Sequence, residues 1–125
     1  MEMKKKEIIE GNRLIAEFLG SKFINDAPED YPNGYYYQPE EIEGDCPTGI
    51  PEDWCFESSW DWLMSVVEKI ESLDWGVEIT RNSCSIKCGS KPNKFFETYK
   101  VCDTKIEAVW LACVGFSDWY NINYK

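Results

Sequence analysis

Apolar residues recur at helical spacing in three stretches of the chain. The first stretch, residues 5–19, is followed by Gly20, a typical helix stop signal, and contains Gly11 as a weak point. The second stretch begins at Ser58 or Ser59, either of which can cap the start of a helix. Its apolar positions follow the i, i+3, i+4, i+7 pattern and are Leu63, Val66, Val67, Ile70 and Leu73. The pattern predicts two amphipathic helices, each with an apolar stripe that needs a surface to cover.

A third helix has the clearest start signal. Thr104 and Glu107 have the spacing of a capping box, in which both side chains satisfy free backbone N–H groups at the start of a helix. The apolar face that follows is marked by Ile106, Val109, Trp110, Cys113, Ser117 and Tyr120, with Phe116 beside it. The helix is expected to run nearly to the C-terminus.

Between the second and third helices the pattern changes to alternation. Residues 77–80 and 84–88 alternate apolar and polar positions, and residues 81–83 are expected to form the turn between them. After a break at residues 91–93, a third strand is expected from Phe95 to Cys102. Three adjacent strands indicate an antiparallel meander.

The span from Ser21 to Glu57 is less regular. A structureless connection of that length is uncommon in a compact domain, so short strands are expected within it. Residues 22–24 and 35–38 are the candidates, separated by Pro32-Asn33-Gly34, whose Asn-Gly pair suits a tight hairpin turn. Residues 39–53 are acidic and contain three prolines, which favours an exposed loop.

Together these elements predict a single α+β domain over residues 1–125. The expected architecture is a small antiparallel sheet sandwiched between helices, an αβα sandwich with about three helices and four to five strands. Hydrophobic residues make up 43% of the 125-residue chain and aromatic residues 15%, which is sufficient for one core. No internal repeat or long linker divides the chain.

The chain shows no membrane or export segment. Charged residues interrupt the first twenty positions, and no apolar stretch approaches the roughly 20 residues needed to cross a bilayer. A cytoplasmic location is therefore expected, where the six cysteines would be free thiols. On one strand Cys84 and Cys88 would lie about 13 Å apart on the same face, too far to form a disulfide. Cys113 is expected in the core.

The net charge of −10 is unevenly distributed. No Lys or Arg lies between Lys22 and Lys69, whereas Asp and Glu are frequent in that span. Direct nucleic-acid binding is disfavoured, because phosphate contacts need clustered basic side chains. An acidic surface suits a basic protein partner, although solvation alone also explains such a run of charges.

The sequence contains no recognisable catalytic or metal-binding apparatus. It has no histidine, so Ser-His-Asp and Cys-His arrangements are impossible. Carboxylates that are close in sequence, Glu40, Glu41, Glu43 and Asp45, lie in a proline-rich stretch that offers little burial to shift their pKa values. We therefore interpret them as a solvated acidic loop and expect no enzymatic activity.

Metal and cofactor motifs are equally weak. Of the cysteines, only Cys84-x3-Cys88 approaches a zinc-binding pair, and free thiols are the simpler interpretation. Asp45, Glu52 and Asp53 near Gly49 do not match the spacing of a calcium-binding loop. Glycine-rich nucleotide motifs are missing, so no cofactor is expected.

Aromatic residues gather at two places. Trp54, Trp60 and Trp62 lie just before and within the second helix, where they either pack at the edge of the sandwich or provide an exposed anchor for a partner. In Tyr35-Tyr36-Tyr37, alternation along a strand must turn the middle side chain away from its two neighbours. One face of this segment therefore exposes aromatic surface unless something covers it.

Residues 10–18, 58–70 and 104–110 resemble a known family, small proteins of phages and Bacteroides-type bacterial genomes described as phage αβα (ABA) sandwich domains. The Ser-Trp-Asp-Trp-Leu-Met run at residues 59–64 is the most distinctive part. Members of the family often carry Tyr-His where this chain has Phe56 and Glu57. The resemblance implies a helix-sheet-helix sandwich and a mobile-element origin, and it implies no activity.

Two functions follow as hypotheses. The first is a phage-derived protein-interaction domain that binds an unidentified protein partner, for which the acidic surface suits a basic one. Its candidate surface consists of Tyr35, Tyr36, Tyr37, Glu40, Glu41, Glu43, Asp45 and Trp54. The alternative is a small-molecule or nucleotide-binding module, with an aromatic pocket between the sheet and a helix lined by Trp110 and Phe95. The sequence specifies neither the partner nor the oligomeric state.

Overall fold

The computed structural model describes residues 4–24, 32–40, 46–88 and 97–124. Within these residues it contains three α-helices, five strands and one turn of 3-10 helix. The helices are α1 (Lys5–Leu19), α2 (Trp60–Ser72), α3 (Lys105–Tyr124) and the 3-10 turn η1 (Pro51–Asp53). The strands are β1 (Lys22–Ile24), β2 (Tyr35–Tyr37), β3 (Trp75–Ile79), β4 (Ser83–Cys88) and β5 (Glu97–Val101). The predicted α+β class, with small antiparallel sheets and helices packed beside them, is confirmed.

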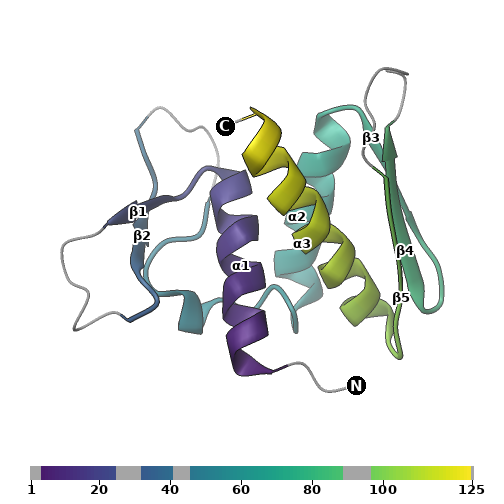
Figure 1. Cartoon of the computed structure of the whole chain (residues 1–125), viewed down its shortest axis with the longest axis horizontal. Coiled ribbons are helices and arrows are strands. Elements are labelled where there is room, and N and C mark those ends of the chain that lie inside the picture. The colour runs from purple at the N-terminus through teal and green to yellow at the C-terminus, as the bar shows by residue number, and fades with distance from the viewer. Residues whose placement is uncertain (1–3, 25–31, 41–45, 89–96, 125) are drawn as a thin grey trace.

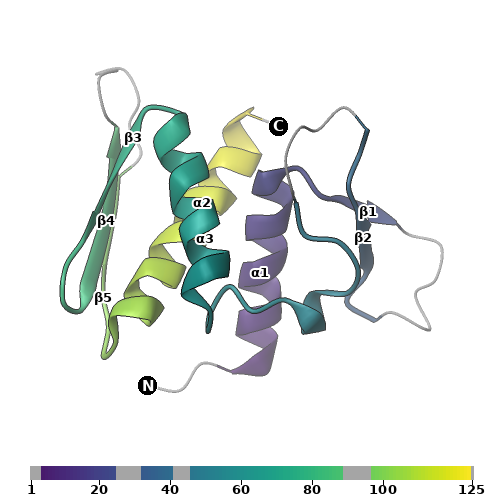
Figure 2. The same cartoon turned by 180° about the vertical axis from the view of Figure 1, so that it is seen from behind.

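The helices occupy the middle of the molecule, with a sheet on either side (Figures 1 and 2). α2 contacts β3, and α3 contacts β4 and β5, so these two helices cover one face of the three-stranded sheet. α1 packs on α3, on the side of the helical layer nearer the two-stranded sheet β1-β2. Helix α3 is therefore the central element, in contact with both other helices and with the larger sheet.

Each helix begins or ends where its local sequence predicted. Gly20 adopts the left-handed conformation at φ 109°, and its N–H bonds to the last carbonyls of α1. At the start of α2, Ser59 Oγ accepts a hydrogen bond from the Trp62 N–H at 3.5 Å. At the start of α3, Thr104 Oγ1 accepts one from the Glu107 N–H at 3.3 Å. These caps confirm all three helix assignments.

The predicted meander is also confirmed. β4 pairs antiparallel with β3 on one side and with β5 on the other. Its Cys84 and Ile86 are fully buried beneath the helices. On β5, Tyr99 and Val101 are exposed. The apolar residues of β4 therefore face the helices, as alternation predicts, while its small Ser83 and Ser85, on the other face, are also buried.

The two strands of the smaller sheet pair as predicted, but the prediction of a tight hairpin turn between them is wrong. Lys22 pairs with Tyr37, and ten residues separate the ends of the strands. Gly34 (φ 92°) instead allows a close approach, because a Cβ at this position would lie 2.7 Å from Cδ2 of Phe23. The Asn-Gly pair thus serves packing against an aromatic ring rather than a two-residue turn.

The prediction that residues 39–53 form an exposed loop is met only in part by the residues that the structure describes, of which Glu40, Glu52 and Asp53 are exposed and the prolines are not. Pro39, Pro47 and Pro51 are buried. The backbone of Gly49 exchanges two hydrogen bonds with that of Tyr36, at 2.8 and 2.9 Å. Buried proline leaves no backbone N–H unsatisfied, Gly49 finds its backbone partners in β2, and the Pro47 carbonyl accepts from Ser21 Oγ, so this stretch is held against the domain.

A polar chain connects the helices through the core. The indole N–H of Trp110, on α3, donates to Asn12 Oδ1 at 2.8 Å, and both residues are almost fully buried. Asn12, on α1, donates through Nδ2 to Glu57 Oε1 at 3.0 Å, just before α2. These two hydrogen bonds satisfy buried polar atoms and fix the relative positions of the three helices.

Aromatic rings fill the other end of the helical layer. Phe116, on α3, is fully buried and contacts Phe18 of α1 at 5.4 Å and Trp75 of β3 at 5.1 Å, between ring centroids. It also lies beside Trp119 and Tyr120, which follow on the same helix. Phe116 therefore joins α1, α3 and the larger sheet in one apolar cluster.

Gly11 is the contact point between α1 and α3 rather than merely a weak point in a helix. A Cβ at this position would lie 2.6 Å from Cη2 of Trp110. We expect Gly11→Ala to destabilise the domain by about 1–2 kcal/mol, because overpacking outweighs the gain in helix propensity. Urea denaturation followed by circular dichroism would measure the change.

Gly115 in α3 provides the matched control. Its added Cβ would meet Thr98 Oγ1 at 3.6 Å, an ordinary contact. Gly115→Ala is therefore expected to be neutral or to stabilise the domain by up to about 1 kcal/mol through helix propensity. Equal effects of the two substitutions would contradict the role given to Gly11.

Candidate functional site

Of the three tyrosines predicted to form a surface, two are exposed and one lies in the core. Tyr35 and Tyr37 are 39% and 42% exposed, whereas Tyr36 between them is fully buried. The Tyr36 hydroxyl accepts a hydrogen bond from Arg13 Nε at 2.9 Å. Burial raises the pKa of this hydroxyl, and the guanidinium group opposes that rise. Tyr36 is therefore corrected from a surface residue to a core residue.

Trp54 is corrected in the same way. It is 5% exposed, its ring lies 5.2 Å from that of Tyr36, and its indole N–H donates to the Thr48 carbonyl at 3.0 Å. Both the apolar ring and the polar N–H are thus satisfied inside the domain. Of the predicted acidic residues, Glu40 is exposed, and Glu41, Glu43 and Asp45 lie outside the described residues.

The other two tryptophans of this region are exposed. Trp60 and Trp62, in the first turn of α2, keep 38% and 36% of their surface accessible. Trp62 also packs edge-on against the buried Phe56, with ring centroids 5.1 Å apart. The hypothesis of an exposed tryptophan anchor is therefore compatible with these two residues and excluded for Trp54.

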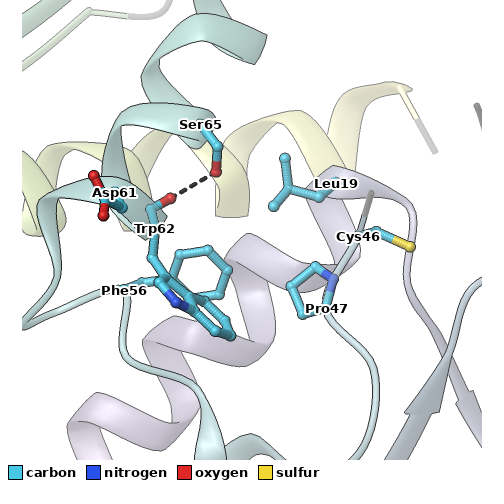
Figure 3. Close-up of a pocket in the computed structure, with 7 residues that line it drawn as sticks. All are labelled: Leu19, Cys46, Pro47, Phe56, Asp61, Trp62 and Ser65. Carbon is cyan, nitrogen blue, oxygen red and sulfur yellow. Dashed lines mark hydrogen bonds between the residues drawn. The ribbon is translucent and has the colours of Figure 1, made fainter. Parts of the chain in front are cut away.

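Trp62 lines a pocket of about 320 Å³ between the end of α1, the segment that begins at Cys46, and the start of α2 (Figure 3). We call it the α2 pocket. Its lining residues are Leu19, Cys46, Pro47, Phe56, Asp61, Trp62 and Ser65. Among them, only Trp62 was considered as a binding residue from the sequence. The others come from separate parts of the chain, and no local motif marks them.

The chemistry of the α2 pocket is apolar with an acidic contribution. The Phe56 and Trp62 rings lie together in Figure 3, opposite Leu19 and Pro47. The Ser65 hydroxyl is already engaged, since it donates to the Trp62 carbonyl at 2.6 Å. Among the lining residues that the structure describes, Asp61 is the one carboxylate and Cys46 the one thiol. This set suits an apolar group beside a positive charge.

The pocket of the alternative hypothesis is not where it was predicted. Trp110 is 2% exposed and belongs to the polar chain in the core, and it is not among the described residues that line the α2 pocket. Phe95 lies outside the described residues. The prediction of Trp110 as a pocket residue is wrong because its ring fills the contact with Gly11.

Cys46, Cys55, Cys84, Cys102 and Cys113 are free thiols, and Cys84 and Cys113 are fully buried. Burial raises the pKa of Cys84 to about 11. Burial and the nearby Cys84 raise the pKa of Cys113. Both thiols are therefore protonated and poorly nucleophilic at neutral pH. Among the described residues, no three His, Cys, Asp or Glu side chains are grouped to hold a metal ion.

Two further observations bear on the class of protein. None of the described helices combines the length and apolarity needed to cross a membrane. Comparison with protein-family models, curated proteins and solved structures found no match for this chain. The resemblance to phage αβα sandwich domains thus stays a prediction from sequence motifs, and function has to be argued from geometry and charge.

Proposed function

We propose that the chain is a non-catalytic protein-interaction domain, of phage or other mobile-element origin, that binds a basic segment of a partner protein. The binding region is residues 35–62, which we call the acidic aromatic segment. Its exposed members among the described residues include Tyr35, Tyr37, Glu40, Glu52, Asp53, Trp60, Asp61 and Trp62. The observation that carries the proposal is the exposure of large aromatic side chains in a segment that contains no Lys or Arg.

The charge of this segment selects the partner. Since the nearest basic residues in sequence are Lys22 and Lys69, no cation within the segment neutralises its carboxylates. Such a field attracts basic surfaces over a distance set by ionic strength, about 10 Å at 0.1 M salt. Tyrosine and tryptophan supply contact area, because they dominate interface hot spots. Charge thus steers the partner, and the aromatic residues hold it.

Packing supports the proposal as well. The pairing of Gly49 with Tyr36 joins two parts of the acidic aromatic segment to each other, and Ser21 Oγ, just after α1, donates to the Pro47 carbonyl. Binding surfaces that are already ordered lose little entropy on association. Five free thiols among the described residues accord with a reducing compartment, so we propose a cytoplasmic location for the interaction.

A nucleotide-binding function is less well supported. The α2 pocket, at about 320 Å³, is at the lower end of the sizes of small-molecule sites. None of its described lining residues is a Lys or Arg that could bind a phosphate, and Asp61 would repel one. A small cationic ligand fits its chemistry better than a nucleotide does.

Charge reversal tests the proposed function. Immobilised wild-type domain would capture partners from host lysate, and captured proteins would be identified, purified and tested for direct binding in 0.05 M and 0.3 M salt. We expect Glu52→Lys/Asp53→Lys to weaken that binding by about fivefold to tenfold, since each exposed charge contributes about 0.2–1 kcal/mol. The effect should shrink at the higher salt concentration.

Glu78→Lys is the control, because Glu78 is exposed on β3 in the other sheet. It changes net charge in the same direction but leaves the acidic aromatic segment intact. Binding that is insensitive to salt, or that responds equally to the two charge reversals, would refute the proposal.

A further inference from the structure

The α2 pocket carries an inference that rests on the proposed function and specifies its ligand. We propose that the pocket anchors a single aromatic side chain of the bound segment, and that a lysine or arginine next to this side chain in the partner pairs with Asp61. The interaction is therefore a two-part contact, in which one apolar ring is buried and one charge is neutralised.

The walls of the pocket favour an aromatic occupant. Phe56 is 1% exposed and provides a fixed surface, while Trp62 leaves 36% of its surface uncovered. Their planes are 82° apart, so an inserted ring can lie edge-on to one and stack on the other. The volume of about 320 Å³ accommodates one large side chain rather than a folded element. Filling it removes the exposed face of Trp62 from water.

The electrostatics favour a cation beside that ring. Asp61 and Trp62 are consecutive residues in the first turn of α2, and both line the pocket. A cation near Asp61 is therefore also close to an indole ring, which attracts positive charge through its π face. Apart from Leu19, every lining residue belongs to the span between Lys22 and Lys69, which has no Lys or Arg of its own.

The pocket is also built to hold its shape. Pro47 is buried, and its carbonyl accepts the hydrogen bond from Ser21. The Cys46 N–H donates a hydrogen bond to Gln38 Oε1 at 3.4 Å. On the opposite wall, Ser65 donates to the Trp62 carbonyl. Anchoring on both walls lowers the entropic cost of binding.

Synthetic peptides test the inference directly. The probe is a capped pentapeptide with phenylalanine at its centre and arginine on both sides, titrated into ¹⁵N-labelled full-length protein at low salt. We expect shifts of the Trp62 indole resonance and a dissociation constant about tenfold lower than that of the same peptide with central alanine. Replacing both arginines by glutamate should abolish detectable binding. Equal affinity for the phenylalanine and alanine peptides would overturn the proposal.

Variants locate the contact. Trp62→Ala should remove the preference for phenylalanine over alanine, and Asp61→Asn should weaken binding about threefold to fivefold and reduce its salt dependence. Met64→Ala is the matched control, because Met64 is 37% exposed on the same helix and does not line the pocket. Loss of the preference in Met64→Ala, or its survival in Trp62→Ala, would place the ring elsewhere.

Alkylation of cysteine gives a readout that does not depend on affinity. Cys46 lines the pocket, whereas Cys55 is similarly half-buried outside it. Saturating phenylalanine peptide should slow the reaction of Cys46 with iodoacetamide and leave that of Cys55 unchanged, as measured by peptide mass mapping. Protection of neither thiol, or of both equally, would contradict occupancy of the pocket.

These outcomes separate the inference from the function on which it rests. If Trp62→Ala binds the natural partner as tightly as the wild type does, while Glu52→Lys/Asp53→Lys weakens binding, the pocket proposal fails and the interaction surface remains. If the peptide occupies the pocket but no salt-sensitive protein partner exists, the pocket remains and the proposed function fails. A free arylalkylamine that matches the affinity of the peptide would identify a small-molecule site and overturn the peptide inference.

Discussion

Replacing Trp110 by phenylalanine is expected to lower the free energy of unfolding by about 2–4 kcal/mol. The smaller ring leaves a cavity at the contact between α1 and α3, where Trp110 is 2% exposed. It also removes the donor to Asn12 Oδ1, which is buried and has to be desolvated without compensation. Urea denaturation monitored by circular dichroism would give the change.

A double-mutant cycle separates the two causes. If the hydrogen bond contributes, Trp110→Phe and Asn12→Ala together should cost less than the sum of the single substitutions, with a coupling energy of about 1–2 kcal/mol. Trp60→Phe is the control, because Trp60 is 38% exposed, and it should change stability by less than about 0.5 kcal/mol. A similarly small effect of Trp110→Phe would show that the polar chain does not hold the helices.

Phe116→Ala is expected to have an even larger effect, a loss of about 3–5 kcal/mol. Phe116 is fully buried and contacts rings on α1, on β3 and on its own helix, so its removal opens a cavity where three elements meet. Because small domains are stabilised by only about 5–15 kcal/mol, the variant should show a large drop in melting temperature.

Two further variants keep this prediction testable if Phe116→Ala does not fold. Phe116→Leu retains most of the apolar volume and should cost about 1–2 kcal/mol. Tyr124→Ala removes a ring that stacks on Tyr120 at 4.8 Å but is 46% exposed, and it should cost less than about 1 kcal/mol. A Phe116→Ala variant as stable as Tyr124→Ala would contradict the central position given to this ring.

The sequence predicted those parts of the fold that local physics decides. α1 ends where Gly20 permits a left-handed residue, and α2 and α3 begin where Ser59 and Thr104 accept backbone hydrogen bonds. The meander followed from alternation, because a strand that buries one face must alternate. Each of these signals lies within a few residues of the element that it defines.

The parts that were wrong or missed depend on contacts between distant residues. No sequence signal near Gly49 indicates its pairing with Tyr36, so the proline-rich acidic stretch around it was interpreted as a loop. Tyr36 and Trp54 were assigned to a surface because aromatic residues in polar surroundings often bind partners, yet they pack on each other. The α2 pocket escaped prediction for the same reason, since Leu19 joins it from the far end of α1.

The candidate surface was therefore predicted in outline and corrected in detail. Its acidity followed directly from composition, and Tyr35 and Tyr37 are exposed as alternation required. Which tryptophan faces solvent was not accessible from spacing alone, because burial of Trp54 depends on a hydrogen bond to Thr48. Acidity is a property of composition, whereas a pocket is a property of tertiary contact.

The central position of α3 has a consequence for how the domain opens. Because this helix contacts α1, α2 and the larger sheet, these elements cannot separate from one another without breaking contacts to α3. Amide protons of α3 should therefore exchange with deuterium only through global opening, and those of α1, α2 and β4 should share the same slow limit. The domain is expected to behave as a single cooperative unit, without a stable fragment that survives its partial melting.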